Sequence, residues 1–162
     1  MLRTKEPLGS DRMSGTSQTK IEIRGNVTCF VRSAVHGRLL YRVHSKNLVV
    51  TTGLNLIRDL LGGIGLRPDK IAVGSGVAAV TASDVALGTE TLKKLIDRRV
   101  RTVGAIEYQM LVLAGEANGT TISEIGTFEE ATLLARAVLS SPIVKTAAIE
   151  VTVSHLFTIA NA

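Results

Sequence analysis

Alternation of apolar and polar residues is the dominant pattern in this chain, and it is clearest near the C-terminus. The run AIEVTVSHLFTIA alternates over its whole length, and its apolar side carries Ile149, Val151, Val153, Phe157 and Ile159. Polar residues fill most of the other side, although His155 interrupts the apolar side and Leu156 the polar side. This pattern predicts a half-buried β-strand.

The same alternation predicts a hairpin near the start of the folded region. IEIRGNVTCFVRS and LLYRVHSKNLVV flank Val35-His36-Gly37-Arg38, a short polar segment with a glycine suited to a turn. We therefore expect strands near residues 21–33 and 39–50.

Further strands are predicted in the second half of the chain. KIAVGSG indicates a short strand that ends in a Gly-Ser-Gly turn, and VGAIEYQMLVLAGE alternates with Ile106, Tyr108, Met110 and Val112 on one side. An Asn118-Gly119 turn precedes a strand around residues 122–125, and a loop then leads to a strand near 133–139. TLKKLIDRRV fits either a helix or a strand.

One segment has the spacing of an α-helix. In TTGLNLIRDLLGG the residues Leu54, Ile57, Leu60 and Leu61 recur at helical intervals. Thr52 is suited to cap the front of the helix and Gly62-Gly63 to end it, which predicts a helix over about residues 53–62. A helix this short is not stable alone, so its apolar face must pack on the sheet.

The total of about six to eight strands with one helix predicts a mainly β fold. We expect residues 20–162 to form an antiparallel β-sandwich or jelly-roll-like domain. Residues 1–19 are polar and rich in Ser, Gly and Thr, so they cannot bury enough apolar surface to fold alone. We expect an extended or flexible N-terminal arm that becomes ordered on a neighbouring subunit; the alternative is a disordered tail or the remnant of an expression tag.

Composition limits the class of protein. A length of 162 residues with 45% hydrophobic and 20% charged residues indicates one globular domain plus an extension. No apolar run approaches the roughly 20 residues needed to cross a bilayer, and the N-terminus lacks the apolar centre of a secretion signal. We therefore expect a soluble protein that stays in the cell that makes it until something releases it.

The net charge of +5 suits an acidic partner surface, but the basic residues are scattered. The densest group is Arg98, Arg99 and Arg101, in which alternation directs Arg99 and Arg101 to one face of a strand. On such a face a solvated or subunit-pairing role is favoured over contact with phosphate. Aromatic residues for base stacking are only 3% of the chain, which argues against a single-strand binding groove. Direct nucleic-acid binding is not expected.

Residues that often carry chemistry are isolated in this sequence. Cys29 is the single cysteine, and its place in a predicted strand favours a small buried thiol over a nucleophile. The three histidines, His36, His44 and His155, form no close pair that would indicate a metal site.

The glycines Gly74 and Gly76 are interpreted as a turn. A phosphate cradle would require a following Lys-Ser/Thr pair or a helix, and neither is present. Ser75 lacks the wider spacing of a nucleophile elbow, so an esterase is not expected.

Glu124 lies between Ile122 and Ile125 in a predicted strand. Together with Glu129-Glu130 it could flank a glycosidic bond in a depolymerase, but sugar sites usually add aromatic platforms. We interpret Glu124 as structural, bonded to backbone amides or paired with Arg136. The sequence therefore predicts no catalytic, cofactor-binding or metal-binding residues, and no enzyme.

An ordered series of short motifs adds a resemblance to this description. The segments are an Asn-to-Gly stretch before the helix (47–53), Ala-Val-Gly-Ser-Gly (72–76), Ile-Ser-Glu-Ile-Gly (122–126) and the closing strand (149–159). In order and spacing, residues 46–159 resemble a family of small virion structural proteins of tailed bacteriophages, described as tail-fibre-like or tail-collar proteins. Thr127 departs from the pattern, because relatives tend to carry a larger apolar residue there.

The resemblance implies a non-enzymatic building block of a phage particle. We expect a homo-oligomer, with a trimer as one candidate state, that contacts other virion proteins of the tail, neck or capsid. The leading role is a tail or neck fibre or adaptor protein; a capsid cement or decoration protein is the alternative, and a host-surface recognition module is the second. The low aromatic content favours the adaptor and cement roles over a receptor-binding tip, which tends to need exposed aromatic residues to bind sugars. The implied location is the virion, after synthesis in the cytoplasm of the bacterial host, with no membrane contact.

Overall fold

The computed structural model describes residues 20–161. The arm predicted over residues 1–19 lies outside the described residues, so its role stays a prediction.

Nine strands and one helix make up the described chain. They are β1 (Ile21–Ser33), β2 (Leu39–Val49), α1 (Thr51–Leu61), β3 (Lys70–Gly74), β4 (Glu90–Leu95), β5 (Arg98–Thr102), β6 (Ala105–Val112), β7 (Thr121–Glu129), β8 (Thr132–Val144) and β9 (Ile149–Asn161). The predicted range of six to eight strands was too low, because the ambiguous segment TLKKLIDRRV contributes to both β4 and β5.

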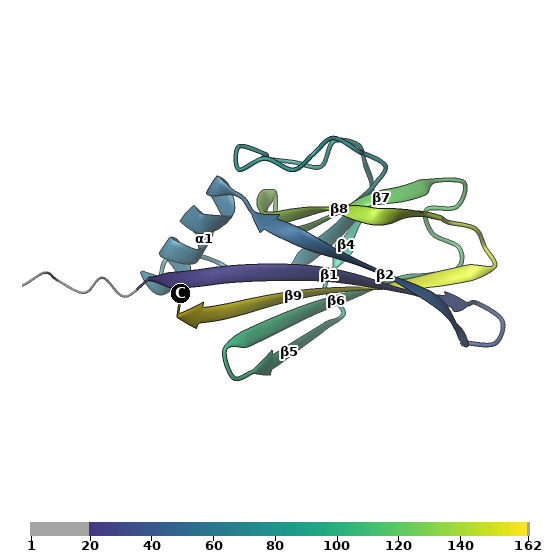
Figure 1. The fold of residues 1–162 in the computed structure, drawn as a ribbon, viewed down its shortest axis with the longest axis horizontal. Coiled ribbons are helices and arrows are strands. Elements are labelled where there is room, and N and C mark those ends of the chain that lie inside the picture. Colours follow the sequence, from purple (N-terminus) through teal and green to yellow (C-terminus); the bar gives the residue numbers. More distant parts are fainter. Residues whose placement is uncertain (1–19, 162) are drawn as a thin grey trace, which may run out of the picture.

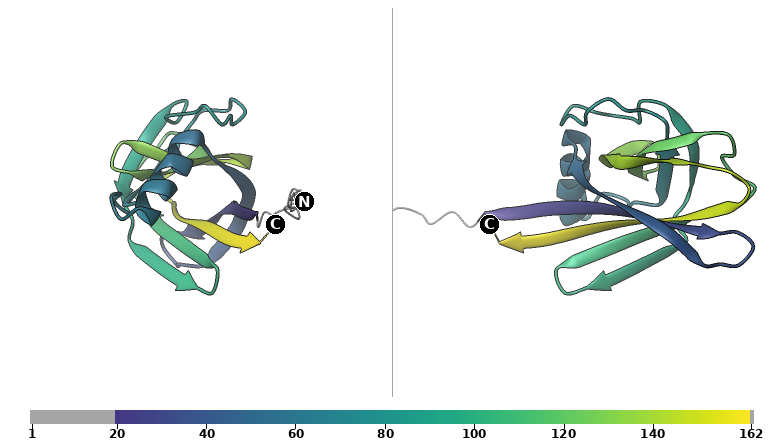
Figure 2. Two further views of the ribbon diagram at one scale, coloured as in Figure 1. Left: turned by 90° about the vertical axis from the view of Figure 1, so that its left-hand side faces the viewer. Right: turned by 45° about the vertical axis from the view of Figure 1, so that its right-hand side comes forward.

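The strands form one antiparallel sheet in the order β4-β3-β7-β8-β2-β1-β9-β6-β5. The sheet curls so that its two halves face each other (Figures 1 and 2), and α1 lies at one end. The two edge strands, β4 and β5, are consecutive in sequence and joined only by Ile96 and Asp97. The predicted mainly β, antiparallel fold with one short helix is confirmed, and the curled sheet is compatible with a sandwich.

Inward-facing side chains of both halves form the larger of two hydrophobic clusters. Alternate residues of β1, β6 and β9 are buried, namely Val27, Cys29 and Val31, then Tyr108, Met110 and Val112, then Val151, Val153 and Phe157. The period of two predicted from the sequence is therefore confirmed in these strands. In the first hairpin, β1 ends where predicted, β2 ends one residue early, and Gly37 adopts a φ of +63° in the turn.

The helix begins two residues before the predicted start, and Thr52 does not cap it. Thr52 lies inside the first turn and donates its hydroxyl hydrogen to the carbonyl oxygen of Leu133 (2.8 Å), which fixes α1 to β8. Val50 occupies the N-cap position without a side-chain bond. The predicted end is confirmed, because Gly62 caps the helix and Gly63 follows with a φ of +73°.

Strands β7 and β8 are longer than the sequence predicted. They are joined by a tight turn in which Glu130 has a φ of +46°, and the predicted loop residue Glu129 is the last residue of β7. The polar Ser140-Ser141-Pro142 segment does not end β8. The strand passes through this segment where its register with β7 shifts, a place that tolerates proline.

Candidate functional site

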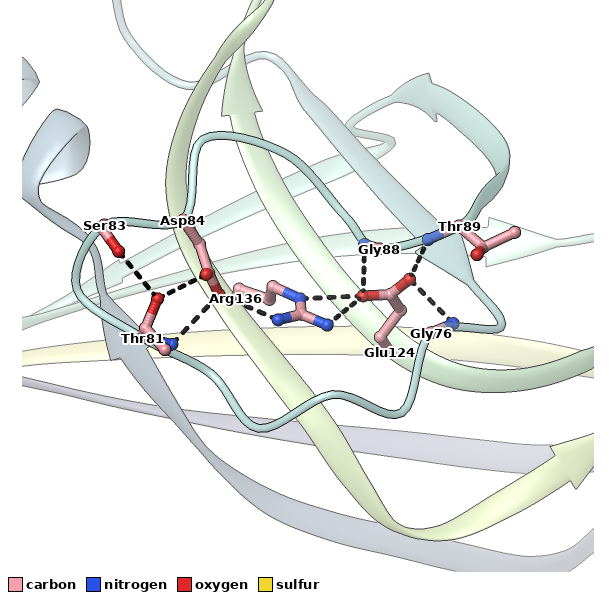
Figure 3. A network of polar contacts seen from close by, with 8 residues as sticks. All are labelled: Gly76, Thr81, Ser83, Asp84, Gly88, Thr89, Glu124 and Arg136. Atoms are coloured by element: carbon pink, nitrogen blue, oxygen red, sulfur yellow. Dashed lines mark hydrogen bonds and ion pairs between the residues drawn. The ribbon is translucent and has the colours of Figure 1, made fainter.

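The most extensive polar cluster centres on Glu124, which the sequence analysis interpreted as structural. Glu124 comes from β7 and its side chain is fully buried. It faces the long connection between β3 and β4, residues 75–89, which folds over this part of the sheet (Figure 3).

Three backbone amides of this connection donate hydrogen bonds to the carboxylate. Oε1 accepts from Gly76 (2.9 Å) and Thr89 (2.8 Å), and Oε2 accepts from Gly88 (3.0 Å). The carboxylate thereby holds both ends of the connection, which confirms the predicted bonding of Glu124 to backbone amides.

Arg136 of β8 completes the cluster. Its Nε donates to Oε2 of Glu124 at 2.8 Å, and Nη2 lies 2.7 Å from the same oxygen, off the hydrogen-bonding angle. On the other side, Nη1 donates to Asp84 at 2.8 Å, and Asp84 accepts from the amide and hydroxyl of Thr81. The predicted Glu124–Arg136 pair is confirmed, and Asp84 is a partner that the sequence did not indicate.

The charge states follow from these contacts. Burial raises the pKa of Glu124, but the amide bonds from Thr89 and Gly88 and the guanidinium of Arg136 outweigh it, so the pKa lies below its ordinary value. The pKa of Asp84 also lies below its ordinary value, because burial raises it less than Thr81 and Arg136 lower it. A carboxylate that is ionised and fully bonded is not available as a general acid.

The Gly-Ser-Gly segment requires glycine at both positions because of this cluster. A Cβ at Gly76 would collide with the carboxylate of Glu124, and one at Gly74 would collide with the carbonyl oxygen of Thr89. The amides of this loop do bind an anion, but the anion is the protein's own Glu124. The interpretation as a structural turn therefore fits the geometry better than a phosphate cradle.

Cys29 and His155 are buried in the core. Burial raises the pKa of the Cys29 thiol to about 12, so the reactive thiolate is scarce. His155 is bonded on both ring nitrogens, to Thr127 through Nδ1 (2.7 Å) and to Asn47 through Nε2. Burial lowers its pKa to about 3, so the ring is neutral. Thr127, the residue that departs from the resemblance, is thus the polar partner of a buried imidazole.

Lys145 is a buried cation that sequence reasoning missed. It follows β8, is fully buried, and donates to the carbonyls of Ala114 and Thr146 and to Oδ1 of Asn118 at 3.0–3.2 Å. These bonds hold the predicted Asn118-Gly119 turn, where Gly119 has a φ of +78°. Its role is structural.

The outer edge of β2 is a prominent exposed feature. β2 pairs with β1 along most of its length, but its ladder with β8 covers only Leu48 and Val49. Ser140 of β8 also bonds to His44 and Ser45, so residues 39–43 are the part of this edge that has no second partner in the described chain. Leu39, Leu40 and Tyr41 are each more than 40% exposed on this segment.

The direction of the free backbone groups at this edge can be assigned. The carbonyl oxygen of His44 points away from β1, because it accepts the hydroxyl of Ser140 (2.9 Å). In an antiparallel ladder the groups of alternate residues point to the same side, so the N–H and C=O of Arg42 also point outward. This edge therefore offers main-chain donors and acceptors beside apolar side chains.

The predicted arginine group is split between two faces of β5. Arg99 and Arg101 stand opposite Tyr108 and Ile106 of β6, so they share the inner face of the sheet, and Arg98 lies on the other.

Within residues 20–161 there is no group of three or more His, Cys, Asp or Glu side chains arranged to hold a metal ion. Over the same residues, no helix has the length and apolar character needed to span a membrane.

Comparison with known proteins adds no family. No family model, no curated protein and no solved structure is significantly similar to this chain.

Proposed function

We propose that this protein is a structural component of a tailed-phage virion, a tail or neck fibre or adaptor protein that assembles with copies of itself. The ordered motifs described above support the phage assignment through resemblance. The observation that carries the assembly role is the open, apolar edge of β2.

The chemistry of the edge suits strand addition. An antiparallel strand from a second copy can pair with the outward N–H and C=O groups of Arg42, while Leu39 and Tyr41 lose exposed apolar surface. Burial of apolar surface stabilises by about 25 cal/mol per Å². Repetition of one such contact around a closed axis gives a symmetric oligomer.

The titratable groups singled out in the sequence do not compete with this role. Glu124, His155 and Cys29 are buried and serve the fold. Tail, neck and capsid positions could all use the same edge, so the location on the particle is a separate question from the mode of assembly.

Arg42→Pro tests the assembly edge. Proline removes the outward N–H without touching the β1 ladder, and an edge position tolerates it. We expect Arg42→Pro to remain folded by circular dichroism but to be monomeric in light scattering, while wild type and the matched control Arg42→Ala remain oligomeric. A wild-type monomer, or an Arg42→Pro oligomer of unchanged size, contradicts assembly through β2.

The virion assignment needs a separate experiment. Particles from a phage that encodes the chain are purified and analysed by mass spectrometry, and labelled antibodies locate the protein by electron microscopy. We expect it in intact particles at the tail or neck; label on the capsid shell would support the cement role instead, and absence from particles would refute the proposal.

Deletion of residues 1–19 should leave a folded body that no longer enters particles, and unchanged incorporation would count against a docking arm.

A further inference from the structure

An apolar cavity lies between α1 and the inner face of the sheet. Figure 1 shows α1 at this end of the molecule. Its volume is about 170 Å³. Ile57 and Leu60 line it from the helix, and Ile106, Tyr108 and Phe157 line it from the strands. A dry cavity of about 150 Å³ with such a lining is known to bind a benzene-sized molecule.

A second hollow, of about 320 Å³, shares two residues with this cavity, Ile106 and Tyr108. Its other lining residues are all arginines, namely Arg67, Arg99 and Arg101. The register of β5 with β6 places Arg99 opposite Tyr108 and Arg101 opposite Ile106, so both guanidinium groups come from the same face as the apolar lining. The two hollows therefore adjoin, and Ile106 and Tyr108 belong to the walls of both.

The arginines of this hollow lack carboxylate partners. Among residues 20–161 no carboxylate oxygen lies within 4.0 Å of Arg67, Arg99 or Arg101, and Arg99 donates only to the carbonyl of Pro68 (3.2 Å). The phenol beside them also responds to these charges, because burial raises the pKa of Tyr108 while Arg99 and Arg67 act in the opposite direction. Three like charges around one hollow are complementary to an anion.

We propose that this junction binds an organic acid in which one carboxylate is joined to an apolar group of about the size of a benzene ring. The apolar group enters the cavity beneath α1, and the carboxylate faces Arg99 and Arg101. The chain's own residues 1–19 are a poor occupant, because their basic residues outnumber their acidic ones. This site is independent of the proposed assembly edge.

The probe for this site is 3-phenylpropionate, titrated into the ¹⁵N-labelled full chain and followed by NMR. A ligand of this size in a preformed site has an expected dissociation constant on the order of 1 mM. We expect shifts of the amide resonances of Ile57, Ile106 and Tyr108, and weaker binding as salt is raised. Acetate, which lacks the apolar group, and 3-phenylpropylamine, which reverses the charge, should each bind at least about tenfold more weakly.

The variants Arg99→Gln and Arg101→Gln change exposed side chains, so the fold should persist. Each should weaken 3-phenylpropionate about tenfold, whereas Arg98→Gln on the opposite face of β5 should not. Equal binding of acid and amine, equal binding of acetate, or no shift with 3-phenylpropionate at roughly 10 mM overturns the proposal. In the last case the arginines serve only to protect the edge of β5. A peptide ending in phenylalanine that binds more tightly than 3-phenylpropionate, and no longer does so when its C-terminal carboxylate is amidated, would identify a protein C-terminus as the source of the same acid.

Discussion

Replacement of Glu124 by glutamine is the sharpest test of the polar cluster, because it removes one charge and almost no volume. The glutamine oxygen can still accept from two of the amides, but its NH₂ group then faces donors of Gly88 and Arg136. Removal of one partner from a buried ion pair costs about 3–5 kcal/mol. This is a large part of the roughly 5–15 kcal/mol that keeps a typical domain folded.

The assay is urea unfolding at neutral pH, with Glu129→Gln as the matched control. Glu129 lies on the same strand but makes no side-chain hydrogen bond or ion pair among the described residues. We expect Glu124→Gln to lose about 3–5 kcal/mol, or roughly 10 °C in melting temperature, and the control to change little. Hydrogen exchange at the amides of Gly76, Gly88 and Thr89 should also accelerate.

A loss below about 1 kcal/mol would refute the reasoning, since that is the range of a solvated surface pair. The pH dependence gives a second check. The pKa of Glu124 is lower in the folded state than its ordinary value of 4.5, so its contribution is present above that pH and is lost as the pH falls further. Glu124→Gln should remove this part of the acid sensitivity.

Three further outcomes are expected. Gly76→Ala should destabilise by about 2 kcal/mol or more in urea unfolding, because its Cβ meets the carboxylate of Glu124, whereas Gly115→Ala, with open space around it, should not. The pKa of His155 is about 3 in the folded state against an ordinary 6.5, so the unfolded chain gains a proton first and stability falls by about 1.4 kcal/mol per pH unit from pH 6.5 downward. His155→Gln should flatten this slope between pH 6.5 and 4.5. An unchanged slope would show that a group other than His155 causes the loss of stability. Cys29 should resist Ellman's reagent at pH 8 until the chain unfolds, and rapid modification of the native protein would contradict its burial.

Local patterns predicted the elements well where one face is buried. The bounds of β1, the burial of alternate residues in β6 and β9, and the end of α1 at Gly62 all follow from side-chain period and glycine chemistry. The start of α1 was wrong because Thr52 bonds to the neighbouring strand instead of to its own helix. A tertiary contact displaced a local cap, and no local pattern contains that information.

The polar cluster was half predictable. A carboxylate between two isoleucines on a strand must be bonded if it is buried, so the amide and arginine partners of Glu124 could be inferred. Asp84 could not, because it lies in a polar connection whose path depends on the packing of β3, β7 and β8. The same applies to Lys145, whose burial depends on a turn that folds back over it.

The pairing of β1 with β9 has a kinetic consequence. Ile21 pairs with Asn161, so one of the longest ladders of the sheet joins the first and last described strands. On the ribosome β1 can form its hairpin with β2 early, but the other hydrogen-bonding edge of β1 stays unpaired until β9 has emerged. We expect folding in the slow, millisecond-to-second regime of β proteins rich in distant contacts, with the final step after synthesis of β9.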